Sequence, residues 1–399
     1  MEPLLPPDGG KFEARAIELH RAAAALAATA HPITRAALAR LVRIVNSYNS
    51  NLIEGVRTTP AEIDAALHAD YSHDPSRAAS QRLAVAHVEV ELWVTTIPAT
   101  GPAAQVTSAE FLRDIHRGLY KNVPAAERIV RASNGREETV VPGEFRAEDV
   151  TVGRHLAPSP ASLPPLLERF QRGYDPGVLS EVQRIMAFAA SHHRLLWIHP
   201  FLDGNGRVTR LFSVAYARRI GLDGGGLWSI ARGFARYHTE YFAALRAADS
   251  GRRSDLDGRG DLSLQTLELW CDLVVRVALD QITYMRSLLS PETLADRLRA
   301  YAAYRAAQPP QDPDLRWRVE AGELLAALVN RGDMTRSDAQ RMLPGAERTA
   351  RAALATLLSD GILESDSHRS RVRLAFPPAA ATILFPDLGA PPAGTSPYI

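Results

Sequence analysis

The chain has 399 residues, and its charges nearly cancel: 46 Lys and Arg against 45 Asp and Glu, a formal net charge of +1 at pH 7. This balance excludes a global electrostatic attraction to nucleic acid or to a membrane surface. The one cysteine, Cys271, excludes an intrachain disulfide framework. No apolar run approaches the ~18 residues of a membrane span, and the start M-E-P-L-L-P-P-D-G-G does not resemble a signal peptide. We therefore expect a cytoplasmic protein with no membrane partner.

An N-terminal helical region is expected over residues 1–105. One helix begins near residues 32–35 and contains the sequence S-N-L-I-E-G, which runs from Ser50 to Gly55. Taken alone, Glu54 is a surface carboxylate just before a glycine that stops the helix.

Residues 142–160 indicate a short hairpin. Phe145, Val150 and Val152 have β-propensity, and Gly153 permits a turn or the end of a strand. Without further context, the segment is a surface hairpin.

The next two helices are expected over residues 181–198 and 207–219. The first ends because proline, here Pro200, disfavours a helical conformation in the residue before it. His199 therefore stands at the helix exit. Between the helices, Gly204 and Gly206 allow backbone N–H groups to converge at the start of the second helix, which is an anion site by geometry and dipole.

The side chains around this loop suit phosphate chemistry. Arg207 and Arg210 are three residues apart and project from one helix face, and guanidinium groups fit phosphate oxygens. Asp203 offers a hard oxygen ligand for Mg²⁺. His199, with an ordinary pKa near ~6.5, can take a proton from an attacking hydroxyl. The loop is not a Walker motif, because it contains no G-K-[ST].

The whole stretch from His199 to Arg210, H-P-F-L-D-G-N-G-R-V-T-R, resembles the signature of Fic-domain proteins, H-x-F-x-[DE]-G-N-G-R-x-x-R. The resemblance implies a mostly α fold, with a Fic-type helical core over residues 106–305 and a β-hairpin flap. It also implies AMP transfer from Mg·ATP to a Ser, Thr or Tyr hydroxyl of a protein, including the chain itself. The implied roles are a general base at His199, a buried anchor at Phe201, a Mg²⁺ ligand at Asp203, and phosphate binding by Gly204, Asn205, Gly206, Arg207 and Arg210.

The S-N-L-I-E-G segment resembles the inhibitory motif of this family, [ST]-x-x-x-E-[GN]. The resemblance implies that Glu54 pairs with Arg210 and competes with the γ-phosphate, while Ser50 ties the inhibitory helix to the loop. In some family members, the same glutamate aligns a water and AMP is removed instead, so the direction of reaction stays open. By the same resemblance, the flap holds a target segment by strand addition.

Two tyrosines that follow the signature have two possible interpretations. Tyr237 or Tyr241 could flank the adenine, or each could be an aromatic side chain of an amphipathic helix. His192 and His193 precede the signature without the spacing or partners of a metal site, and His192 is expected to pack and to form hydrogen bonds. A long helix is expected over residues 262–289.

The C-terminal part predicts a linker at residues 306–314, a winged helix at 315–385 and a loose tail at 386–399. Helices are expected at 323–330, 335–342 and 347–358, and strands at 362–363 and 372–376. This segment resembles winged helices that are fused to many Fic proteins. Its candidate DNA contacts are Arg348, Arg351, Arg369 and Arg371.

A winged helix can also serve protein contact or dimerisation alone. The sequence therefore leaves two functions open: an auto-inhibited adenylyltransferase, and a nucleotide-sensing regulator that binds DNA. Family members often form homodimers.

Overall fold

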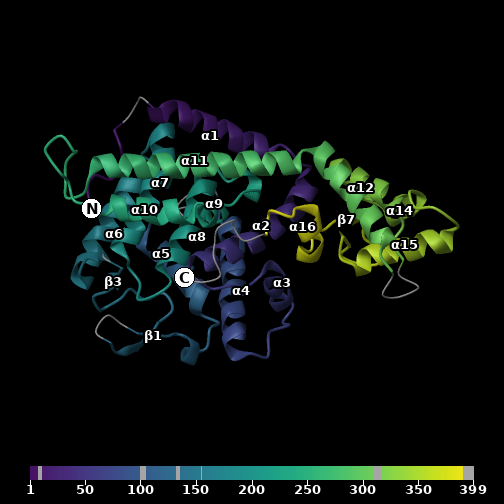
Figure 1. Ribbon diagram of the computed structural model, residues 1–399, viewed down its shortest axis with the longest axis horizontal. Coiled ribbons are helices and arrows are strands. Elements are labelled where there is room, and N and C mark those ends of the chain that lie inside the picture. Colours follow the sequence, from purple (N-terminus) through teal and green to yellow (C-terminus); the bar gives the residue numbers. More distant parts are fainter. Residues whose placement is uncertain (8–10, 99–104, 132–134, 154, 310–315, 390–399) are drawn as a thin grey trace.

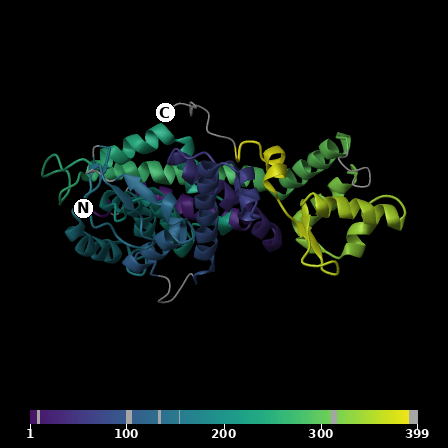
Figure 2. The same cartoon turned by 90° about the horizontal axis from the view of Figure 1, so that it is seen from below.

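The computed structural model describes residues 1–7, 11–98, 105–131, 135–153, 155–309 and 316–389. Most of these residues are helical, and the strands are short. Figure 1 shows an elongated molecule in which a large helical body, crossed by the long helix α11 (Leu264–Leu289), is joined to a smaller C-terminal unit. Figure 2 shows the same division from below. The expected mostly α fold is confirmed.

Four N-terminal helices cover residues 11–96: α1 (Lys11–Ala27), α2 (Pro32–Ile53), α3 (Pro60–Leu67) and α4 (Pro75–Thr96). Proline occupies the first turn of α2, α3 and α4, where a missing N–H costs nothing. Thr59 and Glu62 form a capping box at the start of α3. These local signals define where the helices begin, and Pro32 does so for α2, which carries Ser50.

The central helices are α5 (Ala109–Tyr120), α6 (Leu163–Tyr174), α7 (Glu181–Ile198), α8 (Asn205–Arg219), α9 (Ile230–Arg236) and α10 (His238–Ala248). Helix α7 begins with a capping box between Ser180 and Gln183. It is buried on nearly all sides between α1, α6, α8 and α11, and its buried residues include the polar His192 and His193. The cysteine, Cys271, is buried on α11.

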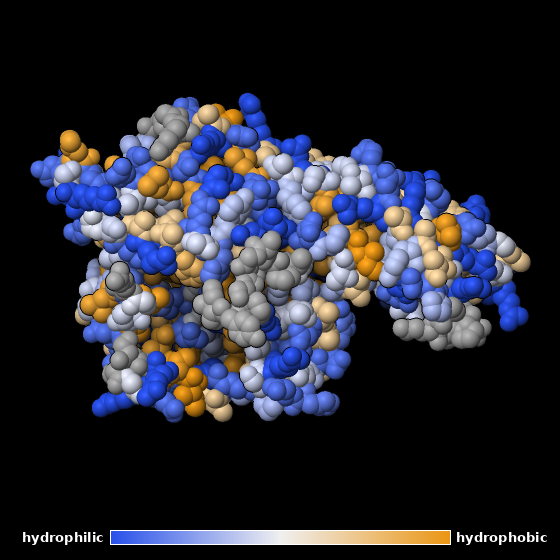
Figure 3. Space-filling model, in the orientation of Figure 1, coloured by the Kyte–Doolittle hydropathy of each residue, from blue (hydrophilic) through white to orange (hydrophobic). Residues whose placement is uncertain are grey.

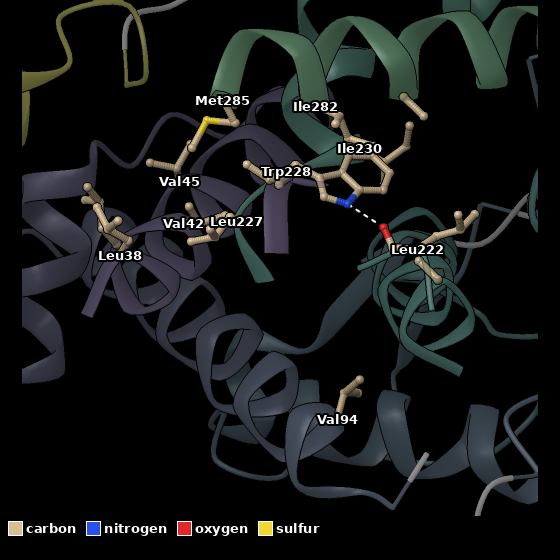
Figure 4. Close-up of a cluster of buried hydrophobic side chains, with 14 of the residues drawn as sticks. Leu38, Val42, Val45, Val94, Leu222, Leu227, Trp228, Ile230, Ile282 and Met285 are labelled. Atoms are coloured by element: carbon tan, nitrogen blue, oxygen red, sulfur yellow. Dashed lines mark hydrogen bonds between the residues drawn. The ribbon is translucent and has the colours of Figure 1, made fainter. Parts of the chain in front are cut away.

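Helix α2 is part of the core of the large body. Its Leu38, Val42 and Val45 gather with Trp228 and with Met285 of α11, and the Trp228 indole N–H donates to the carbonyl of Leu222 over 2.7 Å (Figure 4). The end of α2 is therefore positioned by packing along its whole length.

Two hairpins lie beside the central helices. The expected flap hairpin is present as β3 (Thr151–Val152) and β4 (His155–Leu156), paired Thr151 to Leu156 and Val152 to His155. Its residue 154 lies outside the described residues. Phe145 is not in a strand, and instead its ring packs on Phe201. A second hairpin, β1 (Ile129–Arg131) with β2 (Glu137–Thr139), was not predicted.

In the part of the chain that the structure describes, 3-10 turns lie at Ala125–Glu127, Pro160–Ser162 and Gly224–Gly226.

The C-terminal unit contains α12 (Pro291–Ala307), α13 (Ala321–Arg331), α14 (Arg336–Arg341), α15 (Glu347–Ser359) and α16 (Pro378–Leu384). Its sheet has the order β5-β7-β6, with β5 at Asp333–Met334, β6 at Leu363–Glu364 and β7 at Val372–Leu374. The three expected helices and the β6–β7 pair are present, and α12, β5 and α16 are additional. Residues 310–314 of the expected linker lie outside the described residues.

The C-terminal unit packs directly on α2. The Thr34 hydroxyl lies 3.3 Å from the Leu328 carbonyl and 3.2 Å from the Val329 carbonyl of α13, and Arg40 pairs with Glu364 at 2.5 Å. Helix α16 contacts α3. The N-terminal half of α2 therefore lies against this unit, and its C-terminal end reaches the signature loop.

The start of the expected loose tail is packed, and the prediction was wrong for residues 386–389. Leu388 is buried, and the Arg232 guanidinium donates to the carbonyls of Asp387 (2.8 Å) and Leu388 (3.3 Å). Proline content indicated a loose segment, but buried contacts with the large body outweigh it. Residues 390–399 lie outside the described residues.

Candidate active site

The signature loop is built by a left-handed exit from α7 and a left-handed entry to α8. His199 has φ 48° and ψ 62°, a conformation that is uncommon for a residue other than glycine. Gly204 has φ 77° and caps α8. Strain of this kind, roughly 1–3 kcal/mol, persists only where the surrounding structure enforces it, and it clusters at functional sites.

Asn205 closes this loop. Its Oδ1 accepts a hydrogen bond from the Phe201 N–H (2.9 Å), and its Nδ2 donates to the Phe201 carbonyl (2.8 Å). We expected the Asn205 side chain to hold phosphate, but in the structure its amide binds the loop backbone. Its described contribution is therefore to the shape of the anion site.

The His199 ring is set up to accept a proton. Its Nδ1 lies 3.3 Å from the Leu196 carbonyl, so Nδ1 carries the hydrogen and Nε2 keeps its lone pair. Burial lowers the pKa of His199 to about 4, although the Leu196 carbonyl opposes the shift. The imidazole is therefore neutral near pH 7, as a general base requires.

Two residues that sequence reasoning missed hold the loop from outside. The His116 ring of α5 stacks face to face on Phe201, with centroids 4.1 Å apart and planes within 1°. Its Nδ1 accepts a hydrogen bond from the Gly143 N–H at 2.8 Å. The available signal was the position of His116 on the apolar face of α5, next to Ile115 and Leu119.

Arg146 is the second missed residue. Its Nε donates to the His199 carbonyl at 2.7 Å, and its own backbone N–H donates to the Pro200 carbonyl at 3.0 Å. It is 5% exposed, although arginine is seldom buried unless it is paired. Arg146 therefore ties the segment before the β3–β4 hairpin to His199, and no local pattern in the sequence indicates that contact.

Asp203 faces the start of α8 beside Tyr120. The Tyr120 hydroxyl donates to Asp203 Oδ2 at 2.6 Å, and burial raises the pKa of this tyrosine. One carboxylate beside an anion site fits Mg²⁺, which binds few protein ligands together with phosphates and water. Within the described residues, no group of three or more His, Cys, Asp or Glu side chains forms a dedicated metal site.

The two signature arginines are buried and engaged by α2. Arg207 Nε donates to Asn51 Oδ1 at 2.9 Å. Arg210 Nε donates to Ser50 Oγ at 2.8 Å, and its Nη2 donates to the Ser50 carbonyl at 3.0 Å and to Glu54 Oε1 at 2.5 Å. The structure thus brings Ser50 and Glu54 to Arg210. Asn51, which we did not predict, binds Arg207 in the same way.

Glu54 lies directly over the start of α8. A Cβ added at Gly206 would collide with Glu54 Oε1. Burial disfavours the ionised form of Glu54, but the charges of Arg210 and Arg207 outweigh burial, and its pKa lies below the ordinary value. An ionised carboxylate therefore occupies the place where N–H groups, helix dipole and guanidinium groups converge on an anion.

Tyr241 is an aromatic side chain of the helical core, the second of the two interpretations given above. It is 1% exposed, its ring stacks on Phe234 at 4.4 Å, and its hydroxyl lies 3.2 Å from His192 Nε2. It has no free face for a base, because the aromatic core of the body surrounds it. Tyr237 is half-buried against the guanidinium of Arg276, 5.4 Å from its ring centroid.

The two histidines before the signature form buried hydrogen bonds. His192 Nδ1 lies 2.8 Å from Ser213 Oγ, and His193 Nε2 lies 3.0 Å from Asp249 Oδ1. Both pair α7 with neighbouring helices.

The candidate DNA contacts differ in their partners. Arg351 pairs with Glu347 at 2.6 Å, and Arg371 pairs with Asp333 at 2.8 Å. Arg348 and Arg369 are exposed. Charge at this face is therefore partly neutralised by acidic neighbours.

Comparison with known proteins identifies the central helices. A sequence profile of the Fic/DOC family matches residues 106–217, from the start of α5 through α8. The chain contains a Fic domain. Curated relatives from Drosophila erecta and Drosophila ananassae, each named protein adenylyltransferase Fic, are 38% identical over 87 residues. That stretch is 22% of this chain and 18% of each relative, so the match spans about a fifth of the relatives' length.

Solved structures show the same fold beyond the Fic domain. A Fic family protein from Desulfovibrio desulfuricans is similar over 93% of this chain and 98% of its own, with a TM-score of 0.52 and 16% identity. Fic-1 (residues 134–508) from C. elegans is similar over 69% of this chain and 71% of its own, with a TM-score of 0.51 and 17% identity. In addition, no described helix of this Fic-domain chain is both long and apolar enough to span a membrane.

Proposed function

We propose that this Fic-domain protein transfers AMP from Mg·ATP to a Ser, Thr or Tyr hydroxyl of a protein, and that Glu54 inhibits the transfer. One observation carries the proposal: the Glu54 carboxylate lies on Arg210 and over Gly206, at the anion site of the signature loop. The Drosophila relatives named protein adenylyltransferase support the reaction class.

The chemical step follows from the groups around the loop. With Glu54 displaced, Arg207, Arg210 and the first N–H groups of α8 bind the phosphate chain. His199 Nε2 takes the proton of the target hydroxyl as the hydroxyl oxygen bonds to the α-phosphorus. The bond between the α-phosphorus and the bridging oxygen breaks, and pyrophosphate leaves with that oxygen.

Mg²⁺ is the expected companion of the nucleotide. Asp203 would hold it, and when bound it would neutralise phosphate charge. Tyr120 orients the carboxylate by donating to one of its oxygens, which leaves the other oxygen for the metal.

The flap supports a protein acceptor. The outer residues of the β3–β4 hairpin carry exposed apolar side chains, with Val152 47% and Leu156 69% exposed. A two-stranded edge of this kind can bind an extended segment through main-chain hydrogen bonds. Arg146 links the foot of the flap to the His199 carbonyl. A target segment bound at the flap would therefore lie near His199, the proposed general base.

Intact-mass spectrometry tests the proposal. Wild type, Glu54→Gly and Glu54→Gly/His199→Ala are each incubated with Mg·ATP and a mixture of candidate target proteins. We expect a gain of one AMP on the chain or on a target with Glu54→Gly only. An unmodified mass in all three samples would contradict AMP transfer. Loss of AMP from a previously modified target, dependent on Glu54, would instead show the reverse reaction.

A second candidate function, DNA binding by the expected winged helix, is supported by exposed Arg348 and Arg369. Gel shifts between 50 and 200 mM salt test it, because phosphate contacts make affinity fall steeply with salt. We expect Arg348→Ala/Arg369→Ala to lose binding, whereas His199→Ala keeps it. The absence of a shift at low salt would exclude this function.

A further inference from the structure

A cavity of about 420 Å³ lies between α2, α3, α16 and residues 386–389, away from the signature loop. Leu41, Val45, Tyr48 and Leu52 of α2 form one wall, and Ala381 of α16 lies in the opposite wall. Figure 3 shows hydrophobic residues at this junction between the large body and the C-terminal unit. The volume is within the range of sites for small organic ligands, about 300–1,000 Å³.

The cavity is on the other side of α2 from the active site. Residues 41, 45, 48 and 52 recur at intervals of three and four and so share one helix face. Ser50, Asn51 and Glu54 face α8 from a different side of the helix. A ligand in the cavity therefore does not overlap the phosphate site.

The lining is apolar, with one cation at the mouth. The hydroxyl of Thr59 lies 2.8 Å from Glu62 Oε2, and that of Thr382 donates to the Ala379 carbonyl at 2.8 Å, so neighbouring groups already engage both. Arg57 is exposed and lines the same mouth. Among the residues that the structure describes, no carboxylate lies within ion-pair distance of Arg57.

We propose that this cavity binds a small amphipathic anion, with its apolar body between α2 and α16 and its carboxylate on Arg57. Burial of a hydrocarbon body against apolar side chains supplies affinity. A bidentate guanidinium–carboxylate pair supplies orientation and a preference for acids. A medium-chain carboxylic acid has both parts, and decanoate is a suitable probe.

The experiment uses the full chain and the fluorescent probe 1-anilinonaphthalene-8-sulfonate, which has an apolar body and an anionic group. We expect saturable binding that decanoate displaces and Mg·ATP does not. We also expect decylamine, with the same chain and the opposite charge, to displace the probe at least fivefold less effectively. Displacement by Mg·ATP, or equal displacement by decanoate and decylamine, would overturn the site.

Three variants locate the binding. Arg57→Gln is expected to weaken decanoate binding about tenfold. Arg172→Gln, which changes an exposed arginine on α6, is the control and is expected to leave decanoate binding unchanged. Ala381→Phe fills the cavity and is expected to abolish the part of the probe binding that decanoate displaces. Thermal melting checks that the variant folds. Equal affinity in wild type, Arg57→Gln and Ala381→Phe would refute the proposal. Decanoate binding that appears only after removal of residues 390–399 would also refute it, because the chain's own end would then be the occupant.

Discussion

Glu54 Oε1 lies 2.5 Å from Arg210 Nη2, although the two residues are 156 positions apart in the chain. Arg210 is 2% exposed, and the Glu54 side chain is 34% exposed. The arginine of this ion pair is therefore buried, whereas part of the glutamate side chain is exposed to solvent. A phosphate bound at this site, as proposed above, would have to displace this carboxylate.

Glu54→Gln is expected to raise ATP affinity by about 10–100-fold, because a hydrogen bond between charged groups contributes roughly 1.5–3 kcal/mol that the nucleotide must otherwise replace. Titration calorimetry with Mg²⁺ and a non-hydrolysable ATP analogue measures this affinity. Glu62→Gln, in the capping box of α3, is the matched control and is expected to leave the affinity for the ATP analogue unchanged. Unchanged affinity in Glu54→Gln would show that the carboxylate does not compete with phosphate.

His116→Ala is expected to lower the rate of AMP transfer about tenfold in a Glu54→Gly background, because Phe201 loses its stacking partner and the loop loosens. His116→Phe restores the ring but not the acceptor for the Gly143 N–H, and so should recover part of the rate. Initial rates with radiolabelled ATP measure the effect. If His116→Ala and Glu54→Gly/His116→Ala fold normally and the rate is unaffected, His116 has no positioning role.

The rate of Glu54→Gly should change little between pH 8 and 6. The pKa of His199 is lowered to about 4, so its neutral form, which is the base, persists through this range and is lost only as pH falls through about 4. A histidine with its ordinary pKa would lose half of its base form near pH 6.5. Rates measured at constant Mg·ATP give the profile. A half-maximal rate near pH 6.5 would contradict the low pKa.

The free energy of unfolding should fall as pH drops from 7 to 5. Burial lowers the pKa of a group of histidines: to about 3 for His87, to about 4 for His116, His193 and His199, and well below its ordinary value for His192. Below pH 6.5 the unfolded chain binds protons that the folded chain excludes, so stability is lost at roughly 1–2 kcal/mol for each histidine.

Glu91 opposes part of this loss. Burial raises its pKa to about 8, so the folded chain keeps a proton that the unfolded chain releases, and this contribution grows as pH falls from 8 to 4.5. Because one carboxyl opposes several histidines, the free energy of unfolding still falls as pH drops. Urea unfolding at pH 7, 6 and 5 measures it, and Glu91→Gln should make the loss steeper. Constant stability across this range would contradict neutral burial of the histidines.

Neighbouring residues alone were enough to predict several parts of this protein. Pro200, the glycines of the loop and the apolar spacing of residues 181–198 were enough to predict α7, the loop and the start of α8. These features are local, because helix ends and left-handed turns depend on a few adjacent residues. The resemblance to the Fic signature then assigned roles to His199 and Arg210 that spacing alone does not supply.

Which distant residues meet depends on how the helices pack in three dimensions. The fold placed Asn51 on Arg207, Arg146 on the His199 carbonyl and His116 on Phe201. It also buried Tyr241, which we had considered for adenine. No periodicity encodes such pairs, because each depends on how whole helices pack. A buried arginine or histidine looks in the sequence like one that faces water, and only the partner that the fold brings to it distinguishes the two.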